Sequence, residues 1–339
     1  MKFGHVPVGQ AGGAILAHSM QARSAQDQGA KPYRIGKGTV LTAQHLNDLA
    51  AAGATELTVA RLEAGDLTED DAAQALATAL VPDPAGQNIR ISGAGAGRVN
   101  LYAECAGIVQ IDAAAVAALN DVDPMITVAT VAPYARMGAG GMIATLKIIS
   151  YAVPASRLEQ AGAMARAAIR LLPTEFRSAT LIETASEAAP SEKGRIATQA
   201  RVDQFGMELT PRVVVPHAEA PLAQAIADAP GEMVLILTQS ATSDAHDVAP
   251  EALRQAGGAV IRFGMPVDPG NLLFLGRIGA KPVIGLPGCA RSLALNGADW
   301  VLNRVACGLV VTGADIAAMG VGGLLKEIPS RPMPRARKG

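Results

Sequence analysis

The chain has 339 residues, more than one hydrophobic core usually serves, so its length predicts two or three domains. The 29 lysines and arginines nearly balance the 30 aspartates and glutamates. The formal net charge of -1 therefore excludes the strong positive field with which proteins attract nucleic acid or anionic membranes. The three cysteines, Cys105, Cys289 and Cys307, show no CxxC spacing, which argues against a disulfide framework and a zinc site.

The apolar pattern predicts neither export nor a membrane span. No apolar segment follows Lys2, and no run reaches the roughly 18 apolar residues that a spanning helix needs. We therefore expect a cytoplasmic protein that has a small-molecule partner and binds neither nucleic acid nor a membrane.

Residues 1–85 predict an N-terminal α+β domain. Thr42 is placed to cap a helix, residues 56–60 alternate as a strand, and Thr68 is placed to cap a second helix. The acidic first turn of that second helix suits the positive end of a helix dipole. The prolines that follow it mark the end of this domain.

Residues 86–152 predict a β-rich domain, because short β-branched runs alternate with glycine and Asp/Asn turns around one short alanine helix. Ser156 and Glu159 then have the spacing of a capping box. They predict a connecting helix within residues 153–175 that continues through Leu172.

Residues 176–325 predict an α/β domain of a different kind. Strand-like and helix-like segments alternate regularly from residue 178, which predicts right-handed βαβ units and a doubly wound, mostly parallel sheet with helices on both faces. A hairpin and a last helix at about 292–306 complete it. The basic tail, residues 326–339, is expected to be a solvated end without a function.

The loops that leave the carboxyl ends of parallel strands are the expected ligand site of such a sheet. Three loops qualify: residues 183–193 after the first strand, 238–247 after the third, and 286–292 after the hairpin.

The loop 238–247, TQSATSDAHD, is the strongest candidate by composition, because it precedes a helix whose unpaired N–H groups favour an anion. Asp244 and Asp247 are placed to share Mg²⁺ with phosphate oxygens. The alternative is that Asp247 only caps the next helix, and spacing alone leaves both open. The hydroxyl residues of the loop are Thr238, Ser240, Thr242 and Ser243.

The loop 286–292 has the sequence LPGCARS. It puts Pro287 and Gly288 at a strand end and Arg291 and Ser292 at an expected helix start. Arg291 is the preferred anion contact, and a plain surface arginine is the alternative. The segment Asp268-Pro269-Gly270-Asn271 has the composition of a turn, and local rules alone assign it only a structural role.

The segments TQSATSDAHD, PGNL and LPGCARS follow the order of three motifs, T-G-G-T-S-x-G-x-x-D, P-G-K-P and L-P-G-N-P-x-S. On these segments the chain resembles the molybdenum-cofactor biosynthesis domain of molybdopterin adenylyltransferases and molybdopterin molybdenumtransferases. The sequences FGMPVDPGNLLFLG and NGADWVLNRVACGL are most similar to the molybdopterin-binding segment associated with CTP:molybdopterin cytidylyltransferases. The nucleotide loop of the cytidylyltransferase itself is missing.

This resemblance implies a molybdopterin ligand and a homo-oligomer (dimer or trimer). It implies catalytic roles for Asp247, which matches the acidic position of the motif, and for Glu187, the carboxylate after the first strand. Asp244 stands where the motif has a glycine, and its expected catalytic and Mg²⁺-binding role comes from the analysis of the loop. The cofactor-binding residues that it implies, together with those of the loop analysis, are Thr238, Ser240, Thr242, Ser243, Asp268, Pro269, Gly270, Asn271, Pro287, Gly288, Arg291 and Ser292.

Three functions follow as hypotheses. The first is a molybdopterin-binding protein of cofactor maturation that inserts molybdenum or processes a nucleotidyl-molybdopterin with Mg²⁺. The second is a carrier or sensor without turnover, whose protein partner is a separate cytidylyltransferase or a molybdoenzyme. The third is an α/β enzyme for another phosphorylated metabolite, preferred if nucleotides bind and pterins do not.

Overall fold

The computed structural model describes residues 1–27, 29–186 and 188–325, and the chain forms two compact units. Unit 1 contains residues 1–104, 109–135 and 139–171. Unit 2 contains residues 105–108, 136–138 and those described from 172 onward. Glu187 and the basic tail 326–339 lie outside the described residues. No helix in the described part of the chain is long and apolar enough to cross a membrane.

The first part of unit 1 is a small sheet with one helix. Strand β5 (Glu56–Arg61) pairs antiparallel with β1 (Lys2–Pro7) and β2 (Ile15–Leu16). Helix α1 (Ala43–Ala51) begins as predicted, because the Thr42 hydroxyl accepts the N–H of His45. Leu16, Leu41, Leu49, Leu57 and Val59 are among the apolar side chains buried between these elements. The remaining elements here are η1 (Val8–Gln10), β3 (Met20–Ala22) and β4 (Tyr33–Ile35).

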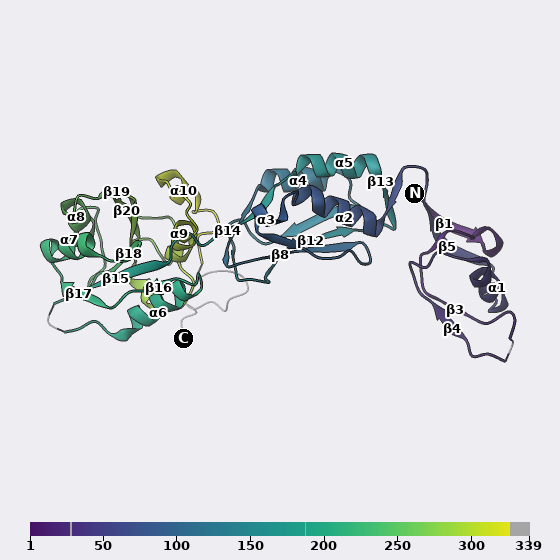
Figure 1. Ribbon diagram of the computed structural model, residues 1–339, viewed down its shortest axis with the longest axis horizontal. Coiled ribbons are helices and arrows are strands. Elements are labelled where there is room, and N and C mark those ends of the chain that lie inside the picture. Colours follow the sequence, from purple (N-terminus) through teal and green to yellow (C-terminus); the bar gives the residue numbers. More distant parts are fainter. Residues whose placement is uncertain (28, 187, 326–339) are drawn as a thin grey trace, which may run out of the picture. The chain divides into compact units, whose positions relative to one another are not determined.

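The rest of unit 1 is a four-stranded antiparallel sheet with helices packed on it (Figure 1). Its order is β10 (Ile126–Thr130), β12 (Met142–Ile148), β8 (Arg98–Ala103) and β7 (Ile89–Ile91). Helix α2 (Glu69–Leu80) packs on β8 and β12, and α4 (Ala113–Val122) packs on β10. Thr68 caps α2 as predicted, and the predicted β-rich runs are strands. The shorter elements of unit 1 are β6 (Asp66–Thr68), α3 (Pro84–Gln87) and β13 (Ala152–Pro154). Strand β9 (Gly107–Ile111) begins with residues of unit 2, and β11 (Arg136–Met137), which pairs with it, belongs to unit 2.

The predicted connecting helix is wrong in its start and in its length. Helix α5 (Ala155–Met164) packs against α2 and α4, and its N-cap, Pro154, makes no side-chain capping bond, so the capping box is absent. The chain turns at Ala167, which has a φ of 56°, and continues as strand β14 (Ile169–Pro173). Ile169 and Leu171 are fully buried there, so strand pairing and burial override the helix preference of the alanine-rich sequence.

Unit 2 is built on one seven-stranded sheet, which confirms a mixed α/β fold. Strand β15 (Ser178–Ala185) runs parallel to β16 (Glu208–Leu209), β17 (Val213–Pro216) and β18 (Met233–Leu237), and β18 runs parallel to β21 (Lys281–Gly285). The order continues through β20 (Phe274–Ile278) to β19 (Ala259–Phe263), each antiparallel to its neighbour. The sheet is therefore mostly parallel, as predicted.

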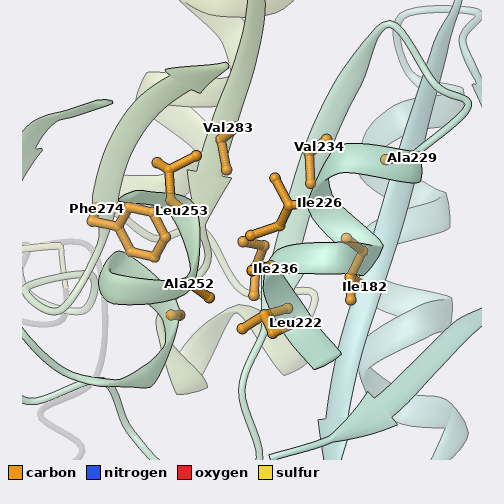
Figure 2. Packing of buried hydrophobic residues seen from close by; sticks show 12 residues of the cluster. Ile182, Leu222, Ile226, Ala229, Val234, Ile236, Ala252, Leu253, Phe274 and Val283 are labelled. Atoms are coloured by element: carbon orange, nitrogen blue, oxygen red, sulfur yellow. The ribbon is translucent and has the colours of Figure 1, made fainter. Parts of the chain in front are cut away.

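Helices cover both faces of this sheet because its strands are apolar on both sides. Helices α7 (Glu219–Asp228) and α8 (Val248–Gln255) cover one face, where Leu222, Ile226 and Leu253 meet Ile236 and Phe274 (Figure 2). Helix α6 (Glu192–Asp203) lies on the other face, so close to the sheet that a Cβ on Gly194 would lie 2.9 Å from Cδ1 of Leu237. The last helix of the described chain is α10 (Gly313–Ala318).

The predicted last helix begins later than expected. Residues Gly288–Arg291 form a single 3-10 turn, η2, and the chain then runs irregularly to Asn296. Asn296 caps helix α9 (Gly297–Ala306) in a capping box with Asp299. Ser292 is therefore not at a helix start, and the prediction of a helix start there is wrong.

Candidate functional site

Three parallel strands bring their following loops to one edge of the unit 2 sheet. Strand β18 pairs with β15 on one side and β21 on the other, and all three point the same way. A pocket of about 550 Å³ lies at this edge. Among the described residues, its lining combines a few alanines and a proline with the polar side chains of Thr184, Ser186, Ser191, Gln239 and Arg291. The predicted meeting of loops after the first strand, third strand and hairpin is thus observed.

Arg212 holds the segment between β15 and α6, which forms one wall of the pocket. Its Nε lies 2.8 Å from Oε2 of Glu183, which is buried at the end of β15. Its two terminal nitrogens donate to Glu192, the first residue of α6, and at 2.7 Å to the carbonyl oxygen of Pro190. Arg212 therefore fixes the segment that leads from the strand to the helix.

His217 links the ends of two strands at this edge. It follows β17, and its Nδ1 lies 2.8 Å from Oγ1 of Thr184, while its Nε2 lies 3.0 Å from Oγ of Ser240. Oγ1 of Thr184 also accepts the N–H of Gln239 at 2.9 Å. The Gln239 side chain in turn accepts the hydroxyl of Ser186. These bonds join pocket-lining residues to the loop after β18.

The loop 238–247 turns inward through its first hydroxyls. Oγ1 of Thr238 donates to the carbonyl oxygen of Ser240 at 2.6 Å and lies 3.2 Å from Oγ1 of Thr242, and both threonines are buried. Their side chains shape the loop. Within the described residues, nothing accepts the main-chain N–H groups of Ser240, Ala241 and Thr242, so three successive donors remain available to an anion.

The two predicted metal ligands accept main-chain N–H groups. Oδ1 of Asp247 accepts from Val248 and Oδ2 accepts from Ser243, so Asp247 caps α8. Oδ1 of Asp244 accepts the N–H of His246. The bond from Ser243 is the main cause that lowers the pKa of Asp247 below its ordinary value. The described residues hold no cluster of three His, Cys, Asp or Glu side chains fit for a metal, so Mg²⁺ would need phosphate oxygens and water to complete its shell.

Arg291, the predicted anion contact, is half-buried in the pocket lining. Its Nη2 donates to the carbonyl oxygen of Thr238 at 2.6 Å, which joins the loop after β21 to the loop after β18. Pro287 precedes η2 and Gly288 begins it, as close neighbours of Arg291. Ser292 is exposed, and its Oγ accepts the N–H of Ala294.

The segment 268–271 does not line the pocket. The carbonyl oxygen of Pro269 accepts the N–H of Gly297, and a Cβ on Gly270 would lie 2.7 Å from that nitrogen. Asp268 bonds to the segment 323–325 through its main chain, and Asn271 bonds to Met265. The structure therefore places this turn against the start of α9, and the pocket brings together residues of the other loops only.

Sequence reasoning did not select Thr184, Ser186, His217, Gln239 or Arg201. For His217 a signal existed, because it stands directly after the strand-like PRVVVP and so at a carboxyl end. Arg201 offered no such signal. It lies within α6, and its terminal nitrogens reach the carbonyl oxygens of Ala290 and Ser292.

Comparison with known families assigns no function. Residues 5–61 match a family described as "Domain of unknown function (DUF8806)", which lies within unit 1. No curated protein matches the chain.

Two solved structures are similar in parts of their folds. The molybdopterin biosynthesis MoeA protein from Pyrococcus horikosii matches with 13% identity over 91% of this chain and 76% of that chain, at a TM-score of 0.32. A MogA structure, described as an anomalous substructure, matches with 21% identity over 38% of this chain and 92% of that chain, at a TM-score of 0.28.

Proposed function

We propose that unit 2 binds a small molecule bearing a phosphate at the carboxyl edge of its sheet. The observation that carries this proposal is the pocket of about 550 Å³, because the polar side chains that the described residues contribute to its lining are hydroxyls, one amide and Arg291. That volume lies within the range of about 300–1,000 Å³ that small-molecule sites occupy. An anion is the ligand class that this set of donors favours.

Two groups of donors support a phosphate. The guanidinium of Arg291 uses Nη2 to hold Thr238 and has further N–H groups to donate. The available main-chain N–H groups of residues 240–242 stand in the same loop that Arg291 contacts. In our proposal the phosphate accepts from both groups, as backbone nests and arginines bind phosphates elsewhere.

We further propose that this ligand is molybdopterin and that the chain acts in molybdenum-cofactor maturation. The support is the order of the segments TQSATSDAHD, PGNL and LPGCARS, two of which supply loops of the pocket edge. Gln239 and Ser240 stand where the motif has glycines. Their side chains bond to Ser186 and His217 and leave the main-chain N–H groups available.

A carrier without turnover is the second candidate, and the capping role of Asp247 favours it. Both Asp247 oxygens already accept main-chain N–H groups, so the carboxylate has a structural task that needs no metal. The enzymatic form of the proposal adds Mg²⁺ between the phosphate and Asp244 and Asp247. Asp247→Asn separates the two forms, because it abolishes turnover in an enzyme and only weakens binding in a carrier.

The test is a titration of the full chain with molybdopterin, followed by pterin fluorescence, with and without Mg²⁺ and with CTP or ATP as competitors. Binding at micromolar concentration or tighter supports the proposal, and a strengthening by Mg²⁺ supports the metal at Asp244 and Asp247. Binding of nucleotides without binding of pterin would instead favour the third hypothesis, an enzyme for another phosphorylated metabolite. Light scattering of the same sample tests the proposed homo-oligomer.

A further inference from the structure

The hydrogen bonds of His217 join it to Ser240 and Thr184 in the arrangement that activates a serine hydroxyl as a nucleophile. Oγ of Ser240 lies 3.0 Å from Nε2 of His217, within the reach needed for proton transfer, and Ser240 is exposed. Nδ1 of the same ring lies 2.8 Å from Oγ1 of Thr184, which is buried. A nucleophile, a base and a third group that orients the base are the parts by which such sites are recognised.

The hydroxyl of Thr184 is able to orient the ring for this role. An hydroxyl oxygen has two acceptor positions, and one of them takes the N–H of Gln239. The other is open to Nδ1–H of His217, and in that tautomer Nε2 has its lone pair directed to the hydroxyl of Ser240. Thr184 is thus a positioning residue, and its buried place at the end of β15 restricts the ring.

A further feature of the loop favours this chemistry. The main-chain N–H groups of Ser240 and Ala241 have no acceptor among the described residues. Donors of this kind stabilise the oxyanion that forms when a serine attacks a carbonyl.

We propose that Ser240 is a nucleophile, that His217 is its general base, and that the pair transfers acyl groups from small esters bound in the adjoining pocket. Because Arg291 lines that pocket, the preferred ester carries a carboxylate or phosphate group. This activity goes beyond pterin binding and does not depend on it.

The step balances without a cofactor. Oγ of Ser240 forms a bond to the carbonyl carbon, and its proton moves to Nε2 of His217. The bond to the leaving alkoxide then breaks, and the alkoxide takes the proton from Nε2. Water next attacks the acyl-serine and gives its proton to Nε2. The bond from Oγ to the acyl carbon breaks, the acid leaves, and Oγ recovers the proton.

The test uses the full chain and a fluorophosphonate, which bonds to an activated serine with loss of fluoride and needs no knowledge of the substrate. Mass spectrometry of the protein and its peptides should find one adduct, on Ser240. Ser240→Ala should remove it, and His217→Gln should slow labelling at least tenfold. Ser156→Ala removes an exposed serine of α5 and should leave the labelling rate unchanged.

A second measurement follows the release of nitrophenol from p-nitrophenyl acetate. The wild type should show an initial burst that matches the protein concentration and is lost in Ser240→Ala. No adduct on Ser240, or equally fast labelling in folded His217→Gln, would overturn the inference. Labelling that persists in a protein without affinity for pterin would overturn only the proposed function.

Discussion

Nε of Arg201, in the last turn of α6, lies 2.6 Å from Oδ1 of Asp299, in the first turn of α9. The same guanidinium donates to the carbonyl oxygens of Ala197, Ala290, Ser292 and Ala294, and Arg201 is only 5% exposed. One buried side chain therefore joins two helices and fastens the loop that carries Arg291.

Replacing Arg201 should destabilise unit 2. Arg201→Met leaves Asp299 without its partner, and breaking a buried ion pair in this way costs about 3 kcal/mol or more. The only tryptophan, Trp300, lies in α9, so its fluorescence during urea unfolding reports on this unit. Arg157→Met, at an exposed arginine of α5, is the control and should leave the Trp300 transition in place. An equal midpoint for both variants would contradict the role of Arg201.

Arg291 should contribute to ligand affinity more than to stability. A hydrogen bond to a charged group is worth about 1.5–3 kcal/mol, so Arg291→Met should weaken pterin binding roughly ten- to a hundredfold. The measurement is the fluorescence titration of the variant. Arg277→Met removes an exposed arginine from β20 and should bind like the wild type. If Arg291→Met binds as tightly, the phosphate lies elsewhere.

Gly285 should tolerate no side chain. A Cβ there would lie 2.0 Å from Cε1 of Phe274, and Phe274 is fully buried in the core beneath α8 (Figure 2). Gly285→Ala should lower the free energy of unfolding by about 2–3 kcal/mol, as overpacked cores do. Gly138→Ala, at a glycine with open space around it, should change it by less than about 0.5 kcal/mol. Urea unfolding measured by Trp300 fluorescence compares the two variants. Equal losses in the free energy of unfolding would show that the core adjusts to the added methyl group and would contradict the prediction.

Asp247 should make unit 2 sensitive to acid. The folded carboxylate has a pKa below the ordinary 3.8, chiefly because the Ser243 N–H donates to it, so the unfolded chain takes up the proton first. Its contribution is complete above 3.8 and is lost as the pH falls through the lower folded value. Asp247→Asn should therefore unfold more easily than the wild type above pH 3.8 and lose that difference progressively as the pH falls below 3.8. Asp228→Asn, at an exposed aspartate of α7, controls for the loss of a carboxylate, and a difference that persists at low pH contradicts the prediction.

Local signals predicted the elements whose ends are set by their own side chains. Thr42 and Thr68 cap α1 and α2 where the sequence predicts, and Asp247 caps α8, because each bond joins residues within a few positions of each other. The alternation of strands and helices after residue 178 predicted a mostly parallel sheet, because each helix returns the chain so that the next strand runs in the same direction. The loops of the pocket followed from that sheet, since parallel strands end at one edge.

The failures occurred where distant residues decide the local structure. Nothing near Ala167 predicts that α5 ends before it, because burial and pairing of the segment 169–173 come from the sheet with β9. The start of α9 at Gly297 is an exception, because it has a local signal: Asn296 and Asp299 have the spacing of a capping box, and the prediction of a helix from about residue 292 overlooked it. Arg201, about ninety positions earlier, holds the carbonyl oxygens of Ser292 and Ala294 that precede this helix.

The sequence by itself determined the net charge, the capped helices, the alternation of strands and helices along the chain, and the loops at which a ligand was expected. These features depend on composition and on neighbours along the chain. Only the tertiary structure decided that Thr184, His217 and Ser240 meet and that Asp268 to Asn271 pack on α9 instead of lining the pocket. The reason is physical: a hydrogen bond between residues on different strands requires the sheet to have formed, and no local pattern encodes its distance.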